Sequence, residues 1–155
     1  TKTAGEEFCK IYNNLYELET VTFRYFNVYG ERQPTKGQYA PVVGLFQKQS
    51  AAGDPMTIVG DGEQTRDYTH VSDVVAANIA AMNAPQEACG EIFNIGTGSS
   101  HSVNDIAKMI GGKVTYIAPR PAEARNTQAD VSKAERILNW RSKVKISDWI
   151  KGEIN

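Results

Sequence analysis

The chain has 155 residues, of which 41% are hydrophobic, enough to bury the core of one ordinary domain without disulfides or metal ions. Lysine and arginine total 17 against 18 aspartate and glutamate residues, so the net charge is −1. This balance excludes the basic surface that nucleic acid or an anionic membrane requires, and neither is an expected partner. No apolar run reaches the roughly 20 residues of a membrane span, and the polar opening TKTAGEE does not resemble a secretory signal. We expect a soluble protein.

Two cysteines, Cys9 and Cys89, lie far apart in the sequence and form neither a CxxC redox motif nor part of a metal-ligand cluster. We therefore expect reduced thiols, a cytoplasmic location and no metal site. The sequence opens at Thr1 inside a helical pattern, so we interpret it as a fragment of a longer chain.

The first elements follow from hydrophobic periodicity. Apolar side chains spaced by three and four predict an amino-terminal helix with one apolar face, formed by Ala4, Phe8, Ile11, Leu15 and Leu18. Residues 21–26 alternate as a strand does, and a loop rich in turn residues runs on to residue 38. A second helix should begin with Pro41 in its first turn and stop at Gly53.

The middle of the chain predicts two strands and a third helix. Residues 56–59 form a short strand, 60–62 a tight turn, and 66–70 a further strand-like segment. One face of the following helix carries Val71, Val74, Val75, Asn78, Ile79 and Met82.

The last third of the sequence again predicts alternating strands and helices. Residues 91–95 read as a strand, and Ser102 with Asp105 has the spacing of a capping box for a helix over 103–110 that Gly111 and Gly112 end. Residues 114–117 form a strand, and the loop 118–130 is long enough to be functional in its own right. Ser132 with Glu135 should cap a helix through Leu138, and a short helix should start after Ser147.

Alternating helices and strands predict an α/β architecture with crossover connections. The GxGxxG loop that opens a dinucleotide-binding fold is absent. Its nearest counterpart, GTGSS at 96–100, follows a strand too late and has the wrong spacing. We therefore do not expect this chain alone to bind a dinucleotide.

Arg66 is the first candidate site residue, in the segment DGEQTRDYTHVSD at 61–73. An arginine fork matches phosphate oxygens in a bidentate fashion and stays charged at any physiological pH, so Arg66 is a candidate diphosphate ligand. The alternative is a surface arginine paired with the neighbouring Asp67.

The motifs that accompany Arg66 favour its role as a diphosphate ligand over a surface pairing with Asp67. Three further stretches, RYFNVYG at 24–30, FNIGTG at 93–98, and RPAEAR with ADVSKA over 120–134, accompany it in order. Together the four stretches resemble the carboxy-terminal half of the extended short-chain dehydrogenase/reductase family, most closely its nucleotide-sugar epimerases of the UDP-glucose 4-epimerase type. The resemblance implies the carboxy-terminal part of a Rossmann-type parallel sheet fold plus the small α/β substrate-binding domain. Residues 1–37 would end the Rossmann-type domain, and 38–155 would mainly form the substrate-binding domain, with about 67–96 returning to the sheet.

The resemblance places part of an NAD site on this chain. Lys2 matches the lysine of a Tyr-x-x-x-Lys pair, whose ammonium lowers the pKa of the catalytic tyrosine beside the ribose of NAD. Tyr25 and Phe26 match positions that line the nicotinamide pocket. The tyrosine of the pair and the glycine-rich loop lie outside this sequence, so NAD would be bound mainly by the missing amino-terminal part. Without the resemblance, Lys2 reads as a solvated residue at a frayed terminus.

The same resemblance implies a nucleotide-sugar site. Arg66 and Arg120 would hold the diphosphate with Asn27, Glu123 would accept from the ribose hydroxyls, Thr57 and Val59 would pair with the uracil edge through their backbone, and Tyr39 would touch the sugar or base. Asn27 reads equally well as a turn cap, and the strand of Thr57 and Val59 as an ordinary amphipathic strand. The chain has Pro121-Ala122 where family members commonly have Pro-Gly, which is harmless unless the position needs a positive φ.

The leading hypothesis is the substrate-binding half of an NAD-dependent epimerase that inverts C4 of a UDP-hexose through a 4-keto intermediate, inactive as this isolated chain. The alternatives are a nucleotide-sugar dehydratase or decarboxylase of the same family, or a non-catalytic nucleotide-diphosphate binding module. In relatives the first helix helps to form a two-fold bundle, so a homodimer is expected.

Overall fold

The computed structural model describes residues 1–35 and 40–152 of the chain. Its helices are α1 (Lys2–Tyr16), α2 (Val42–Ala51), α3 (Val71–Met82), α4 (Val103–Ile110), α5 (Ser132–Leu138) and α6 (Ile146–Ile150), with a 3-10 turn, η1, at Gln86–Ala88. Its strands are β1 (Thr22–Tyr25), β2 (Val28–Tyr29), β3 (Met56–Val59), β4 (Thr65–Arg66), β5 (Thr69–His70), β6 (Ile92–Ile95), β7 (His101–Ser102) and β8 (Val114–Ile117). Within these ranges no helix has both the length and the apolar character to cross a bilayer.

The strands pair across long stretches of sequence. β1 lies parallel to β6, β2 to β5, and β3 to β8, whereas β4 and β7 are antiparallel. Parallel neighbours require crossover connections, and helices supply them, as in the path from β3 through α3 and α4 to β8. The predicted mixed α/β class is therefore what the chain forms.

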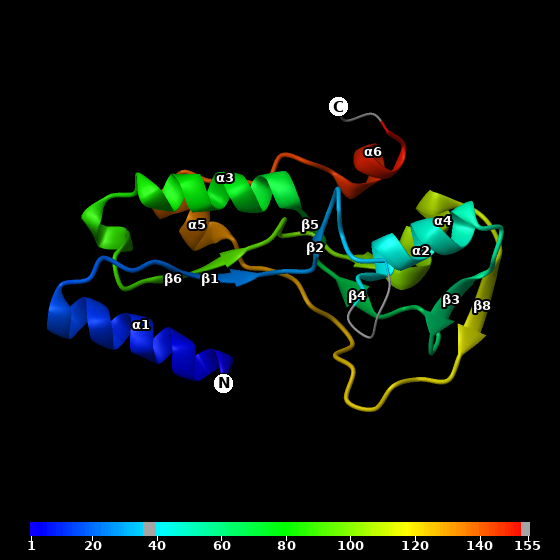
Figure 1. The fold of residues 1–155 in the computed structure, drawn as a ribbon, viewed down its shortest axis with the longest axis horizontal. Helices are drawn as coiled ribbons and strands as arrows, with labels where there is room; N and C mark the ends of the chain where they lie inside the picture. Colours follow the sequence, from blue (N-terminus) through cyan, green and yellow to red (C-terminus); the bar gives the residue numbers. More distant parts are fainter. Residues whose placement is uncertain (36–39, 153–155) are drawn as a thin grey trace.

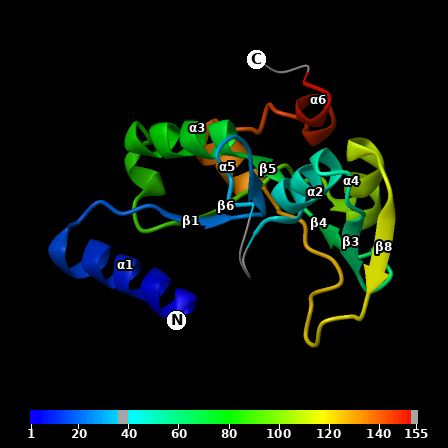
Figure 2. The same cartoon turned by 45° about the vertical axis from the view of Figure 1, so that its right-hand side comes forward.

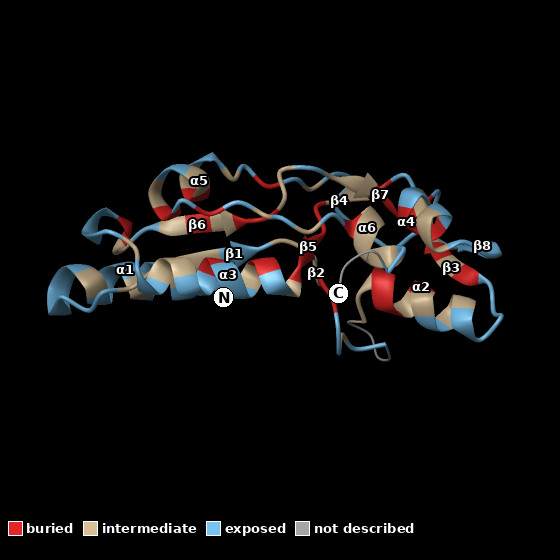
Figure 3. Ribbon diagram, turned by 90° about the horizontal axis from the view of Figure 1, so that it is seen from above, coloured by how far each residue is buried: buried red, intermediate tan, exposed pale blue. Residues whose placement is uncertain are grey.

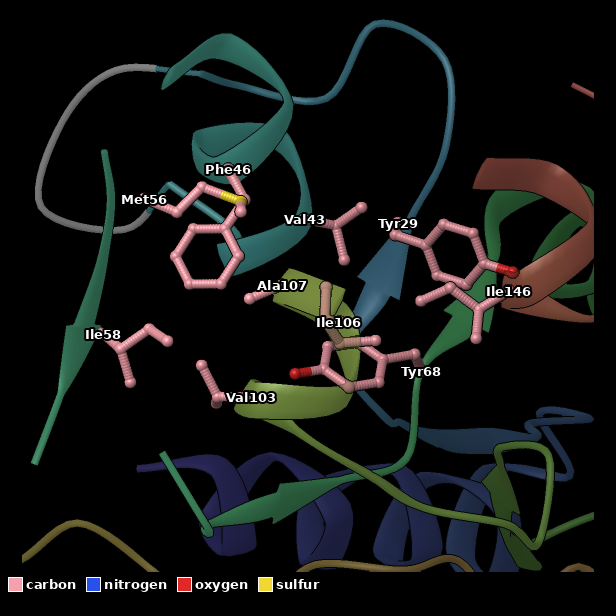
Figure 4. Close-up of a cluster of buried hydrophobic side chains, with 10 residues drawn as sticks. All are labelled: Tyr29, Val43, Phe46, Met56, Ile58, Tyr68, Val103, Ile106, Ala107 and Ile146. Carbon is pink, nitrogen blue, oxygen red and sulfur yellow. The ribbon is translucent and has the colours of Figure 1, made fainter. Parts of the chain in front are cut away.

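The elements gather into two lobes (Figure 1). α1, β1, β6, α3 and α5 form one lobe, while α2, α4, β3 and β8 form the other, an arrangement that the turned view repeats (Figure 2). β2, β4 and β5 lie where the lobes meet. Each lobe has its own buried cluster. The first core comprises Tyr29, Val43, Phe46, Met56, Ile58, Tyr68, Val103, Ile106, Ala107 and Ile146 (Figure 4). The second core comprises Ala77, Ala88, Phe93, Ile95, Ala134, Leu138 and Trp140.

The amino-terminal helix forms as predicted, but its apolar face is exposed. α1 contains no buried residue, and Phe8 and Leu15 are 61% and 70% exposed. Figure 3 shows the contrast with the red, buried stretches of β5 and β6. α3 likewise presents Val75, Ile79 and Met82 to the exterior, while its buried residues are Asp73 and Ala77. These two helices leave broad apolar surface uncovered within the described chain.

Several predicted elements are confirmed at their bounds. Strands occupy 56–59 and 114–117, and a helix occupies 103–110. The capping box is also present: the Ser102 side chain accepts from the Asp105 amide, and the Asp105 carboxylate accepts from the Ser102 amide, each at 3.0 Å. These elements were predictable because their signals are local.

Other predictions were wrong in detail. Residues 66–70 form two strand pieces rather than one, because β4 pairs with β7 and β5 pairs with β2. The predicted cap of α5 is also wrong: Val131 is the N-cap residue, and Ser132, the first helical residue, donates to the Asp130 carboxylate instead.

Three bounds differ slightly from those predicted. Pro41 precedes α2 as its N-cap residue rather than lying in its first turn, α2 ends at Ala51, and α6 starts at Ile146, before Ser147. Strand β2 also occupies two residues of the predicted loop. Such shifts are normal because helix ends fray and adjacent backbone groups compete for the terminal hydrogen bonds.

Candidate functional site

A cavity of about 480 Å³ opens beside the first core, where segments distant in the sequence meet. Its walls come from the start of β2, α2, β3, β4, the beginning of α4 and the residues after β8. The lining residues are Asn27, Val28, Tyr29, Ala40, Pro41, Val42, Val43, Leu45, Thr57, Val59, Gln64, Arg66, Tyr68, Val103, Ile117, Arg120 and Glu123. Six of the ten residues nominated from the sequence are therefore brought together: Asn27, Thr57, Val59, Arg66, Arg120 and Glu123.

Arg66 lies largely buried in the wall of this cavity, its side chain 14% exposed. Nη1 donates to the Thr65 carbonyl at 2.8 Å, and Nη2 donates to Glu123 Oε1 at 3.1 Å. The alternative pairing with Asp67 is wrong, because Asp67 points to a different set of donors. A sheltered guanidinium with an acid as its counter-ion is suited to exchange that acid for an anionic ligand.

Asp67 is fully buried and joins three segments. Oδ1 accepts from the Thr97 amide at 2.8 Å and the Thr97 hydroxyl at 2.7 Å. Oδ2 accepts from the Gly98 amide at 3.0 Å and the Ala129 amide at 3.1 Å. Gly96 has to be glycine here, because a Cβ on it would lie 2.4 Å from the Ala129 Cβ. The GTG motif therefore serves as donor to a buried carboxylate that fixes the backbone next to Arg66.

The residues after β8 form a strap, residues 118–124, that contributes two side chains to the cavity wall. Arg120 and Glu123 belong to it, and every residue of the strap is exposed. A second cavity of about 530 Å³ is lined by strap residues and by the turn after β3, and shares Val59, Gln64, Ile117, Arg120 and Glu123 with the first. Ala122 has φ +59°, so the position does need the left-handed conformation that glycine tolerates better. The strap is thus charged, exposed and locally strained.

Two buried tyrosines in the cavity wall were not nominated from the sequence. The hydroxyls of Tyr29 and Tyr68 have no hydrogen-bond partner among the described residues, although the two residues are 1% and 3% exposed. Burial raises the pKa of both phenols, so both remain donors. The Tyr68 hydroxyl points to the side of Ile58 and Val103 (Figure 4). In the strand-like segment predicted over 66–70, alternate residues share a face, so Tyr68 would lie on the same face as Arg66. This alternation could have identified Tyr68 from the sequence.

His70 is a structural residue in this arrangement. It is buried and acts as the N-cap of α3, where its Nδ1 accepts from the Ser72 amide at 3.3 Å. Trp140 is also buried, and its Nε1 donates to the Asp73 carbonyl at 3.0 Å.

The nominated cofactor residues lie away from the cavity. Lys2 is exposed in the first turn of α1, and Tyr25 Oη is hydrogen-bonded with the Asn78 side chain. The Phe26 amide donates to the Ile95 carbonyl at 3.0 Å, which extends the β1–β6 pairing. Arg24 forks onto Glu6 at 2.7 and 2.6 Å and so holds the end of β1 against the early turns of α1. Tyr39 lies outside the described residues.

Neither cysteine is bonded to the other, since both are free thiols. Across residues 1–35 and 40–152, His, Cys, Asp and Glu form no group of three or more that could hold a metal ion.

Comparison with known proteins places this geometry in a wider context. Residues 1–96 match the family described as the NAD dependent epimerase/dehydratase family. The UDP-glucose 4-epimerase of Mycolicibacterium smegmatis is 36% identical over 155 residues, covering 96% of this chain and 49% of that protein. The UDP-N-acetyl-alpha-D-glucosaminuronate decarboxylase of Bacillus cytotoxicus is 33% identical over 99% of this chain and 50% of its own length.

Solved structures give the same picture. The UDP-glucose 4-epimerase of Thermotoga maritima with UDP-glucose superposes with a TM-score of 0.90 at 36% identity, over 97% of this chain and 49% of that one. The UDP-glucuronic acid 4-epimerase of Bacillus cereus, in complex with UDP-glucuronic acid and NAD, gives 0.86 at 34% identity, over 98% and 49%. The likeness confirms the predicted carboxy-terminal part of a Rossmann-type fold. The chain spans about half the length of the relatives that it matches.

Proposed function

Because the chain belongs to the NAD dependent epimerase/dehydratase family, we propose that it is the substrate-binding half of an enzyme that epimerises C4 of a UDP-hexose. The observation that carries the proposal is the meeting of Asn27, Arg66, Arg120 and Glu123 at one cavity. These residues come from three segments far apart in the sequence. They supply two cations, an amide and a carboxylate, the groups that a nucleoside diphosphate requires.

Each group has a distinct role in this proposal. Arg66 and Arg120 hold the two phosphates, since a guanidinium fork matches phosphate oxygens. Asn27 donates its amide to the same phosphates. Glu123 is released from Arg66 by the incoming diphosphate and accepts from the ribose hydroxyls. The negative charge of the diphosphate thus replaces that of the Glu123 carboxylate, which Arg66 contacts at 3.1 Å.

The uracil and sugar ends are assigned to two further lining residues, Thr57 and Val59, and to Tyr39, which lies outside the described residues. Thr57 and Val59 offer backbone groups of β3 to the uracil edge, and Tyr39 contacts the sugar or base. The buried hydroxyl of Tyr68 becomes a donor to the ligand, which satisfies a polar group that has no partner in the described chain.

The chain contributes only the edge of an NAD site. Lys2 and Phe26 fit such an edge because the Arg24–Glu6 pair holds the end of β1 against the first turns of α1. When bound, NAD would supply reversible hydride transfer at C4 of the sugar. Lys2 would place its ammonium beside the ribose, where it would lower the pKa of a catalytic tyrosine, while Tyr25 and Phe26 would flank the nicotinamide. The glycine-rich loop that would hold the pyrophosphate is not in these 155 residues.

The proposal extends to organisation. Residues 1–37, with about 67–96, belong to the Rossmann-type domain, and most of 38–155 to the substrate-binding domain. The exposed apolar face of α1 supports a homodimer through this helix. The two free thiols fit a cytoplasmic enzyme.

The test is a UDP-galactose to UDP-glucose conversion assay on the intact protein, together with UDP binding. We expect Arg66→Gln to weaken UDP binding by at least about tenfold, because a charge-assisted bidentate contact is lost. Arg141→Gln is the control, because Arg141 is also paired with an acid, Glu135, but does not line the cavity. The isolated 155-residue chain should bind UDP without turnover. Unchanged UDP binding by Arg66→Gln contradicts the proposal.

A decarboxylase is the second candidate, because a decarboxylase is 33% identical over nearly the whole chain. UDP-glucuronate would then yield carbon dioxide and a UDP-pentose, whereas a dehydratase would give a 4-keto-6-deoxy sugar. Product analysis by mass spectrometry separates these reactions from epimerisation, which leaves the mass unchanged. UDP binding without any turnover in the intact protein would favour the non-catalytic binding module.

A further inference from the structure

The strap that carries Arg120 and Glu123 has little to hold it in place. The strap residues, 118–124, are all exposed, so hydrophobic burial does not fix their position. The second cavity, of about 530 Å³, lies between strap residues such as Pro119 and Ala124 and the turn after β3 at Gly60 and Asp61, which line it together. The position of the two charged side chains therefore depends on the Arg66–Glu123 contact at 3.1 Å and on polar ties at the ends of the strap. The proposed ligand would release that contact, which leaves the ties at the ends.

The amino-terminal end is tied by the sheet. Ile117 pairs with Val59 in the β3–β8 ladder, and the Gly60 amide donates to the Ile117 carbonyl at 2.9 Å. Beyond this point the strap leaves the sheet and its backbone has no further strand partner until Arg125 and Asn126.

The carboxyl-terminal end is tied by a fork between Arg125 and Asp61. Arg125 Nη1 donates to Asp61 Oδ1 at 2.7 Å, and Nη2 donates to Oδ2 at 3.0 Å. The Arg125 carbonyl also accepts from the Thr65 amide at 2.9 Å, directly before Arg66. The fork holds the pKa of Asp61 down to about 2, so this tie stays charged at any physiological pH.

Asp61 is a firm anchor for this fork. It lies in the turn after β3, where its Oδ1 also accepts from the Glu63 amide at 3.0 Å. The Asn104 side chain of α4 donates to the Asp61 carbonyl at 2.9 Å, and the Asn104 amide donates to the Gly62 carbonyl at 3.0 Å. A cation tethered to this turn is thereby fixed relative to β3 and α4, the same elements that line the ligand cavity.

We propose that Asp61 and Arg125 form a positioning pair that fixes the strap so that Arg120 and Glu123 face the nucleoside diphosphate. Neither residue lines the first cavity; both line the second cavity, which shares Arg120 and Glu123 with the first. The pair thus lies beside the proposed ligand site, and its proposed role is to position the strap. This assignment rests on the proposed function, because it concerns how that site is held ready. Preordering the strap lowers the entropy lost when the ligand is bound, and so acts on affinity rather than on the chemical step.

The test uses UDP binding and steady-state kinetics on the intact protein with Asp61→Asn, Arg125→Gln and the double variant. Asparagine keeps an oxygen for the Glu63 amide but loses the charged fork. Each single variant should raise the Kd for UDP and the KM for UDP-glucose by about three- to fivefold, the range of a well-aligned exposed ion pair. The value of kcat should stay within about twofold, because binding of the nucleotide is weakened equally in the ground state and in the transition state.

The pair also predicts non-additivity. The double variant should be no worse than either single variant, because the second change removes a partner that is already lost. Arg125→Lys should fall between Arg125→Gln and the unmodified protein, since lysine keeps the charge but not the fork. Arg141→Gln, which removes an equally forked exposed pair at Glu135, should leave Kd and KM unchanged.

Failure of the positioning pair and failure of the proposed function give different results. Unchanged Kd in Asp61→Asn or Arg125→Gln, or additive losses in the double variant, overturns the positioning pair. If Arg66→Gln also leaves UDP binding unchanged, the proposed function itself is wrong. A loss of affinity accompanied by an equal loss in Arg141→Gln would show a general effect of surface charge and would also overturn the inference.

Discussion

Replacing Asp67 by asparagine should destabilise the protein strongly, although the two side chains have nearly the same shape. An amide has one oxygen, which can keep the two Thr97 contacts of Oδ1 at 2.8 and 2.7 Å. Its NH₂ group would then face the Gly98 and Ala129 amides, which now donate to Oδ2 at 3.0 and 3.1 Å. The buried Ala129 amide and the partly buried Gly98 amide lose their acceptor, and each costs about 1–3 kcal/mol, with Gly98 toward the lower end. The expected loss is therefore about 2–6 kcal/mol, against a typical total stability of about 5–15 kcal/mol.

The assay is equilibrium urea unfolding of Asp67→Asn, followed by tryptophan fluorescence. Asp130→Asn is the matched control, because Asp130 also accepts from an amide and a hydroxyl, both of Ser132, but is exposed. It should leave the unfolding free energy nearly unchanged. If Asp67→Asn lowers that free energy by less than about 1 kcal/mol, the buried carboxylate does not bear the contacts assigned to it.

Three further predictions concern the site. Tyr68→Phe should keep or slightly raise the unfolding free energy, because the hydroxyl lacks a partner, yet weaken UDP binding by about 2- to 12-fold in calorimetry; unchanged affinity would remove Tyr68 from the ligand site. Ala122→Gly should raise the unfolding free energy by up to about 1 kcal/mol in the same urea assay. Glycine relieves the strain of the left-handed conformation, and the greater backbone entropy of the unfolded chain offsets part of this gain. A clear decrease in the unfolding free energy contradicts this. In Arg125→Gln, the pKa of Asp61 should rise from about 2 toward the ordinary aspartate value in a carboxyl NMR titration. Since the pKa is depressed in the folded protein, the fork contributes fully above the ordinary aspartate pKa and is lost as pH falls toward 2; no rise would mean that Arg125 is not its cause.

The parts of the fold that could be predicted are those with local causes. The strand at 56–59 alternates within four residues, and the capping box of α4 needs only Ser102 and Asp105. The split of 66–70 could not be predicted in this way, because it depends on which strand each half meets. β7 lies more than thirty residues later in the chain, and β2 about forty earlier.

In the candidate site too, the residue types could be predicted from the sequence but their contacts could not. Arg66, Arg120 and Glu123 were nominated because their residue types and order resemble a family pattern. The resemblance could not show that Arg66 and Glu123 contact each other, since that distance depends on the path of the strap. The sequence showed that Ala122 replaces a glycine of the family pattern, but only the path of the backbone shows that this position has φ +59°. Asp61 and Arg125 lie in two of the stretches that carry the resemblance, but neither was nominated, because exposed charges in loops are common.

The chain passes repeatedly between its two cores. Tyr29 of the first core follows β1 in the other lobe, and the chain returns to the second core at Ala77 and leaves it again after Ile95. α5 then belongs to the second core, and Ile146 of α6 to the first. A protease that cuts the exposed strap would consequently release no independent half. The nicked protein would remain one particle, with both fragments held together, until denaturant separated them.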